Sequence, residues 1–382
     1  MGKVLDRFCV KESLKLKVLA KLLVMISLVF VASSAKATPQ EFLEETEKDY
    51  PLRSIGQLEV KNLKGDIQIQ GWSLDKIRIH LKKRVVAETS AEAKLLLGRI
   101  TYRLRSRDAN DEDIEISNQY ASELSIGERL KESGQAGTQM DFIIMAPSRL
   151  NLQVWSTSGK ITVKNWNANL TIRTREGAVL AEGIKAAKTS VFCKTCLVSL
   201  KQIKGELHFA GEQGAVVLEE VDGKKIYSEL GLGSTSLKQI KGEQLYLGKE
   251  GSIIADGLEG KITFQTKAAR SEFKNISGSL SGSSTSGDIV ARITSWKPSG
   301  QSLIESKEGN IRLTFPRRLA SDVDLWSVYG KTQLDYTLMS LSQETLPEQK
   351  PPHHWVGRLG DGGDLIKVHT ERGDLHFLRA AF

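Results

Sequence analysis

The chain of 382 residues contains 54 lysines and arginines against 46 aspartates and glutamates, a formal net charge of +8 at pH 7. Residues 1–37 hold seven of the basic and two of the acidic residues, a net of +5, which leaves +3 for the remainder. A remainder so weakly basic has little electrostatic attraction for nucleic acid, so we expect no nucleic-acid partner.

Residues 1–37 have the layout of a secretory signal peptide. A basic segment ending at Lys21 precedes an apolar run over 22–32, and the small residues Ala35 and Ala37 mark a cleavage site. The alternative is an uncleaved N-terminal anchor, but the apolar run is shorter than the roughly 20 residues that span a bilayer. We predict cleavage after Ala37 and export to the periplasm or the cell surface, with no stable membrane insertion afterwards.

Residues 38–148 are predicted to form an N-terminal capping region of strands and one short helix. The best helix signal runs over 87–97, with Ser90 as the N-cap and Gly98 as the stop. Residues 40–49 are also compatible with a short helix, whereas the alternating pattern over 76–85 predicts a strand. Exposed sheet edges invite aggregation, so we expect this region to cover the open edge of the repeat array that begins at residue 149.

Residues 149–340 contain an internal repeat of about 18 residues. One glycine column recurs at intervals of 18, 19, 18 and 18, and a second glycine column lies midway. The first column is Gly205, Gly223, Gly242, Gly260 and Gly278, and the second is Gly177, Gly214, Gly233, Gly251, Gly287 and Gly309. Two positions after the second column stand Val179, Val198, Val216, Ile253, Ile289 and Ile311.

This period predicts an all-β fold, a β-solenoid or β-helix-like stack of strand-turn-strand coils with a small α+β cap at its N-terminal end. Apolar and polar residues alternate between the glycines, as in strands, and glycine permits the sharp bends between them. One coil cannot bury its own apolar face, whereas stacked coils share a continuous core. Glycine density and β-branched columns argue against helices, and an evenly spaced β-sandwich is the remaining alternative.

The C-terminal part completes the expected domain organisation. Residues 341–364 are predicted to be an irregular loop, because prolines and glycines interrupt the pattern. Residues 365–382 are predicted to be the closing β strands, one final strand-turn-strand unit.

Taken together, these segments resemble the bacterial putative-adhesin domain family of unknown function. The resemblance rests on "GQLEVKNLKGDIQIQGW", "DFIIMAPSRLNLQVWSTSGKITVKN", the iterated glycine units and the ending "LGDGGDLIKVHTERGDLHF", and it covers about residues 52–379. It implies a β-solenoid in bacterial envelope or surface proteins, with adhesion proposed and no established enzymatic activity. The family offers no catalytic residues to carry over to this chain.

Cys193 and Cys196 form the sharpest local motif. A C-x-x-C pair outside the cytosol is compatible with a redox centre or half of a metal site. Zinc commonly takes four ligands, and no second pair exists in the sequence. We therefore expect a structural role, either a local disulfide across one turn or two small residues facing the core.

The remaining candidates for chemistry have simpler structural interpretations. His353 and His354 are adjacent and cannot point the same way on an extended chain, and Asp361 and Asp364 lack the acidic spacing of calcium loops. Glu176, Glu212 and Glu250 fall near one turn of successive coils, but no acid/base couple stands out among them. We expect no catalytic residues, no cofactor and no metal site.

The sequence thus favours an exported, non-enzymatic protein, monomeric or weakly associating, with an adhesin-like or scaffold role. Its expected partner is an envelope protein or glycan bound on a rigid solenoid face. A polysaccharide-active enzyme built on a β-helix and an envelope-stress sensing module are the alternatives.

Overall fold

The computed structural model describes residues 39–52, 56–106, 113–120, 138–338 and 353–381. The predicted signal peptide therefore lies outside the described residues. The strands up to the long central one are β1 (Gln40–Pro51), β2 (Gln57–Lys64), β3 (Ile67–Trp72), β4 (Lys76–Ala87), β5 (Ile100–Ser106), β6 (Asp113–Tyr120), β7 (Gln139–Pro147), β8 (Asn151–Ser158), β9 (Lys160–Trp166) and β10 (Leu170–Ser286). The later strands are β11 (Ile289–Trp296), β12 (Ser302–Glu308), β13 (Ile311–Phe315), β14 (Ser321–Ser327), β15 (Thr332–Leu334), β16 (His353–Leu359), β17 (Leu365–Arg372) and β18 (Leu375–Arg379).

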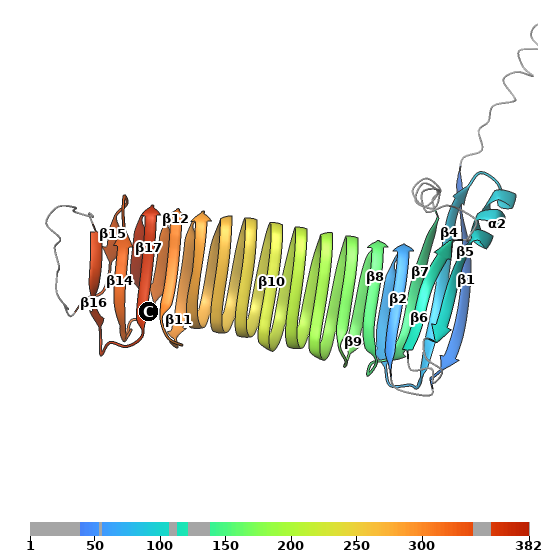
Figure 1. Cartoon of the computed structure of the whole chain (residues 1–382), viewed down its shortest axis with the longest axis horizontal. Helices are drawn as coiled ribbons and strands as arrows, with labels where there is room; N and C mark the ends of the chain where they lie inside the picture. Colours follow the sequence, from blue (N-terminus) through green and yellow to red (C-terminus); the bar gives the residue numbers. More distant parts are fainter. Residues whose placement is uncertain (1–38, 53–55, 107–112, 121–137, 339–352, 382) are drawn as a thin grey trace, which may run out of the picture.

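The described residues form an elongated β-solenoid, as the 18-residue period predicts (Figure 1). β10 winds continuously through the middle of the stack, so its 117 residues cover many coils without a break. Each coil contributes one strand segment to each of two faces. Face A contains β5, β6, β2, β8, one half of each β10 coil, β12, β17, β14 and β16. Face B contains β1, β4, β7, β3, β9, the other halves of β10, β11, β13, β18 and β15.

One apolar core runs between the two faces. Val198, Val216 and Ile253, which the sequence places in one column, are at most 3% exposed and belong to the same core cluster. Parallel register carries the column from coil to coil, with Val179 opposite Ile161 and Ile289 opposite Ile311. The stacked aliphatic columns therefore supply the burial that a single coil cannot.

A second left-handed position recurs along the coils and is mostly not glycine. The residues with φ between 54° and 56° are Asn165, Gln202, Glu220, Gln239 and Asn275. Gly183 and Gly257 have φ of 69° and 73° and continue the same spacing. Each of these coils thus turns through a left-handed residue outside the two glycine columns, a conformation that strains L-residues other than glycine.

The N-terminal region differs from the prediction in two elements. Residues 40–49 are not a helix but part of β1, which pairs antiparallel with β4. The acidic residues of β1 face basic residues of β4, as in the ion pair between Asp49 and Arg78, with an N–O distance of 2.8 Å. These cross-strand pairs favour the sheet over an isolated helix.

The one described helix, α2 (Ser90–Arg99), begins three residues later and ends two residues later than the predicted segment 87–97. Its N-cap is Thr89, not Ser90, because the Thr89 hydroxyl accepts a hydrogen bond from the backbone N–H of Glu92. Gly98 lies inside the helix rather than ending it. No described helix is both long and apolar enough to span a membrane.

Near both ends of the stack, strands are inserted out of sequence order. β2 and β3 lie between the β6–β7 and β8–β9 strands, with which they pair in parallel. At the other end, β17 pairs with both β12 and β14, and β18 pairs with both β13 and β15. The closing strands are therefore inserted into the stack rather than placed at its tip (Figure 1).

The prediction of an irregular loop over residues 341–364 is wrong in part. Residues 341–352 lie outside the described residues, but residues 353–359 form β16, which pairs antiparallel with β14 along its whole length. Two prolines precede this segment, and its own sequence pattern does not indicate a strand. It is extended because it pairs with β14. β16 forms the C-terminal edge of face A.

Candidate functional site

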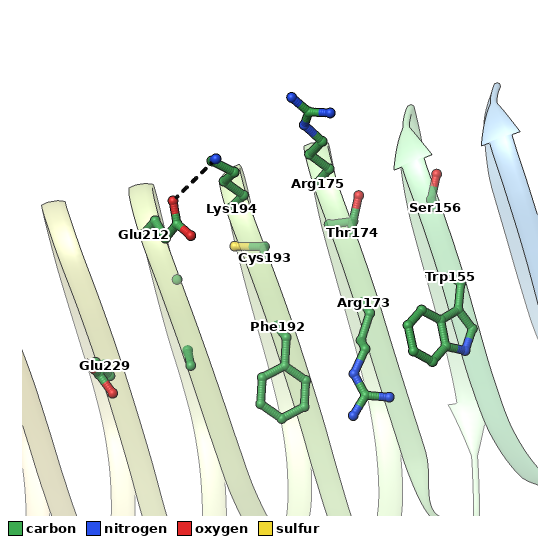
Figure 2. Close-up of a pocket in the computed structure, with 12 residues that line it drawn as sticks. Trp155, Ser156, Arg173, Thr174, Arg175, Phe192, Cys193, Lys194, Glu212 and Glu229 are labelled. Carbon is green, nitrogen blue, oxygen red and sulfur yellow. Dashed lines mark ion pairs between the residues drawn. The ribbon is translucent and has the colours of Figure 1, made fainter. Parts of the chain in front are cut away.

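A shallow hollow of about 550 Å³ lies on face A, between β8 and the first coils of β10 (Figure 2). Its walls are outward-facing side chains, and a few inward-facing residues form its floor. The lining residues are Trp155, Ser156, Arg173, Thr174, Arg175, Phe192, Cys193, Lys194, Ala210, Gly211, Glu212 and Glu229. A volume of this size is within the roughly 300–1,000 Å³ typical of small-molecule sites.

Strand alternation aims the walls of the hollow outward. Val154, Ile172 and Val191 are buried in the core, so the residue that follows each of them points to solvent. Those following residues are Trp155, Arg173 and Phe192. Register places Arg173 directly opposite Trp155 on the neighbouring strand.

Trp155, Arg173 and Phe192 form a stacked trio across neighbouring strands. The Arg173 guanidinium carbon lies 4.7 Å from the centre of the Trp155 ring and 5.1 Å from the centre of the Phe192 ring. Figure 2 shows the arginine side chain between the two rings. Such cation–π contacts hold the guanidinium in place without consuming its N–H donors. No carboxylate in the described part of the chain forms an ion pair with Arg173.

The hollow opens where the row of large side chains is interrupted. Ala210 follows Phe192 at the coil spacing, and Gly211 lies beside it in the floor. A Cβ on Gly211 would lie 2.9 Å from the Phe209 ring and 3.3 Å from the sulfur of Cys193. The floor therefore has no room for a side chain at this position.

The aromatic row continues past the hollow. His208 contacts the Phe192 ring edge-on at 5.2 Å between ring centres, and Tyr227 contacts His208 at 4.8 Å. Burial lowers the pKa of His208, and the nearby Lys188 ammonium lowers it further. The Glu229 carboxylate acts in the opposite direction and raises this pKa, but by less. Burial, with the hydrogen bond to Glu229, raises the pKa of Tyr227 to about 12. Both rings are therefore uncharged at neutral pH.

Charged side chains stand on the rim. Lys194 and Glu212 form an exposed ion pair with an N–O distance of 3.8 Å, drawn as a dashed line in Figure 2. Arg175 is 3.7 Å from Glu176, its neighbour in sequence. Because both pairs are long and solvated, the rim charges are free to reorganise around a ligand.

Residues 198–377 match the family described as Toastrack DUF4097. This part of the chain is therefore similar to the Toastrack family. The match confirms the resemblance drawn from the sequence, and the Toastrack fold agrees with the solenoid described above. The Toastrack segment includes Ala210, Gly211, Glu212 and Glu229 of the hollow, whereas Trp155, Arg173 and Phe192 precede it.

Solved structures similar to this chain include a putative cell adhesion protein from Clostridium sporogenes ATCC 15579, at 8% identity and TM-score 0.21, covering 90% of this chain and 100% of that one. A putative adhesin from Parabacteroides merdae ATCC 43184 has 13% identity and TM-score 0.39, covering 71% and 96%. A putative adhesin from Bacteroides fragilis NCTC 9343 has 11% identity and TM-score 0.22, covering 88% and 97%. Likenesses of this size transfer no function, and no curated protein matches the chain.

The two cysteines just before the Toastrack segment are joined in a disulfide. Their Cα atoms are 6.2 Å apart, and Cys193 and Cys196 are 8% and 5% exposed. Cys193 lies in the floor of the hollow, so the bond staples the turn that carries Lys194 on the rim. A structural role for the pair, as opposed to a redox or metal-binding role, stays a prediction.

The other sequence candidates do not gather into a site. Glu212 reaches the hollow, but Glu176 pairs with Arg175, and Glu250 is exposed outside the lining. Asp364 accepts a hydrogen bond from the backbone N–H of Gly300 at 3.0 Å. Among the described residues, no group of three or more metal-ligating side chains occurs.

The histidines of β16 also have separate surroundings. His354 is hydrogen bonded through Nε2 to Asp324 at 2.8 Å and lies near the Trp326 ring. The side chain of His353 lies outside the described residues, and Asp361 is exposed. Nothing in these contacts resembles a chelating pair.

A pair of carboxylates that the sequence analysis did not single out lies next to the hollow. Glu59 on β2 is opposite Glu115 on β6, and the Lys61 ammonium contacts them at 3.1 Å and 3.3 Å. Lys61 is in turn opposite Trp155. The shared lysine bridges the two carboxylates, and Glu59 is only 5% exposed, so this triad packs beside the hollow rather than forming a separate cavity.

Proposed function

We propose that the mature chain is an exported, non-enzymatic, adhesin-like or scaffold protein that binds an envelope or surface component through face A. The observation that supports this is the hollow itself, where exposed Trp155 and Arg173 stand on a rigid sheet. Aromatic and arginine side chains dominate recognition surfaces because they bury much area and lose little entropy. Stacked coils keep those side chains at fixed spacing.

The test is binding of the purified mature chain, residues 38–382, to cell envelopes isolated from the producing organism. Co-sedimentation of the wild type is compared with Trp155→Ala and with Arg292→Gln, a change of an exposed residue on face B. We expect Trp155→Ala to weaken sedimentation and Arg292→Gln to leave it unchanged. Equal binding by all three proteins would contradict the use of face A, and no binding by the wild type would contradict the function.

Two further readouts address the remaining parts of the proposal. Protease treatment of intact cells distinguishes the cell surface, where the chain is degraded, from the periplasm, where it is protected. Incubation with envelope polysaccharides, followed by a reducing-end assay, checks the non-enzymatic character. Turnover that disappears in a Glu212→Gln variant would replace the binding function with the polysaccharide-active alternative.

A further inference from the structure

We propose that the hollow on face A binds an acidic saccharide, with a carboxylate-bearing sugar ring against Trp155 and its carboxylate on the Arg173 guanidinium. This assignment rests on the proposed function and names its ligand class. It uses a site that spans the N-terminal boundary of the Toastrack segment.

The aromatic side chains favour a sugar ring. Trp155 is 38% exposed, an unusual position for the largest side chain, and Phe192 is half-buried on the other side of Arg173. Pyranose rings carry apolar, slightly positive C–H patches that pack on the negative faces of aromatic rings. A hollow of about 550 Å³ has room for a short oligosaccharide rather than a single ion.

The charge favours one carboxylate. Arg173 has a forked set of N–H donors, and no carboxylate in the described part of the chain pairs with it. Stacking between two rings orients that fork before a ligand arrives, so a bidentate carboxylate bond costs little ordering. Glu212, which pairs with Lys194, and Glu229 stand across the hollow, so the ligand carboxylate is placed on the Arg173 side rather than beside them.

The polar rim suits the hydroxyl groups of a saccharide. Ser156 and Thr174 line the same hollow, and Lys194 and Glu212 supply both donors and acceptors. An acidic peptide would satisfy Arg173 but would not use the ring of Trp155 in the same way. Binding of an acidic saccharide should therefore depend on both Arg173 and Trp155, whereas binding of an acidic peptide should depend mainly on Arg173.

Isothermal titration of the mature chain with trigalacturonate tests the assignment. The methyl ester of trigalacturonate keeps the rings and removes the charge, and triglutamate keeps the charge and removes the rings. We expect the acid to bind at least about tenfold more tightly than either control probe. Tighter or equal binding of triglutamate would overturn the saccharide assignment.

Variants then separate the two contacts. Arg173→Gln is expected to weaken binding of trigalacturonate about 10- to 100-fold and to leave binding of the ester unchanged. Trp155→Ala is expected to weaken both sugars at least about fivefold, whereas Arg292→Gln changes neither. All three residues are exposed, and equal thermal midpoints confirm that the variants are folded. Wild-type affinity in Arg173→Gln would overturn the proposal.

Failure of this inference is distinguishable from failure of the proposed function. A chain that sediments with envelopes but binds no trigalacturonate retains the function and loses this ligand assignment. A chain that binds neither loses both. Release of envelope-bound protein by free trigalacturonate, but not by its methyl ester, would support both the proposed function and the ligand assignment.

Discussion

Substitution of Gly251 by alanine should destabilise the solenoid strongly, whereas the same change at Gly248 should not. Gly251 has φ of +127°, where L side chains are strained. A Cβ there would also overlap the backbone carbonyl of Gly233, the glycine of the preceding coil. Gly248 has no positive φ, and a Cβ on it would make only an ordinary contact of 3.6 Å with the Thr266 side chain.

The expected cost follows from these two causes. Backbone strain at such a position costs about 1–3 kcal/mol, and displacement of a packed neighbour costs about 1–3 kcal/mol more. Alanine lowers the conformational entropy of the unfolded chain relative to glycine, which stabilises the folded state by roughly 0.4–1 kcal/mol. Gly251→Ala should therefore lose about 1–6 kcal/mol, while Gly248→Ala should stay between neutral and a gain of about 1 kcal/mol.

Urea unfolding followed by far-ultraviolet circular dichroism measures the difference. For an m value of about 3 kcal/mol/M, a loss of about 3 kcal/mol lowers the midpoint by about 1 M. Because each coil interacts mainly with its neighbours, the Gly251→Ala substitution also weakens the coupling between the parts of the solenoid on either side of it. The unfolding transition is then expected to split into two steps. If both variants unfold at the same urea concentration, the close contact between Gly251 and the Gly233 carbonyl is not the reason for glycine at position 251.

Three further outcomes are expected. Reduction of the bond between Cys193 and Cys196 should lower the free energy of unfolding by about 2 kcal/mol, from the loop entropy of a separation of three residues; a thiol count of two before reduction would contradict it. Tyr246→Phe should cost about 1–3 kcal/mol at pH 7, because the buried Gln244 amide oxygen loses the phenol donor at 2.7 Å. Burial raises the pKa of Tyr246, so wild-type stability falls as pH rises above about 10, where the unfolded chain ionises, and the gap to the variant should narrow. A gap that stays constant in urea titrations from pH 9 to 11 would refute this cause. Gln239→Gly should raise stability by up to about 1 kcal/mol in the same assay, since φ is 54° there, and a loss would contradict the strain argument.

The stack and its core could be predicted from the sequence because both depend on period. Columns such as Val198 and Val216 repeat at the coil spacing, and parallel stacking then brings them together without further information. The strand at 40–49 could not be predicted in this way. Its composition suits a helix, and only the basic face of β4, many residues away, makes the extended form favourable. Local propensity is overridden here by a cross-strand partner.

The hollow was missed for a related reason. The period that predicts inward columns also places Trp155, Arg173 and Phe192 in one outward column, at spacings of 18 and 19 residues. That signal was present in the sequence. What the spacing does not reveal is that Ala210 and Gly211 leave an opening beside the column, since small residues on a strand are equally compatible with a flat surface.

The inserted strands at both ends connect the architecture to the site. Because β2 lies between β6 and β8, the coil that carries Trp155 is flanked on both sides by paired strands rather than by a free edge. An edge strand would move with the end of the stack, and its side chains would lose their spacing. The chain thus places its hollow near the N-terminal cap but within the continuous sheet, where Trp155 and Arg173 keep the register that a ligand spanning several coils requires.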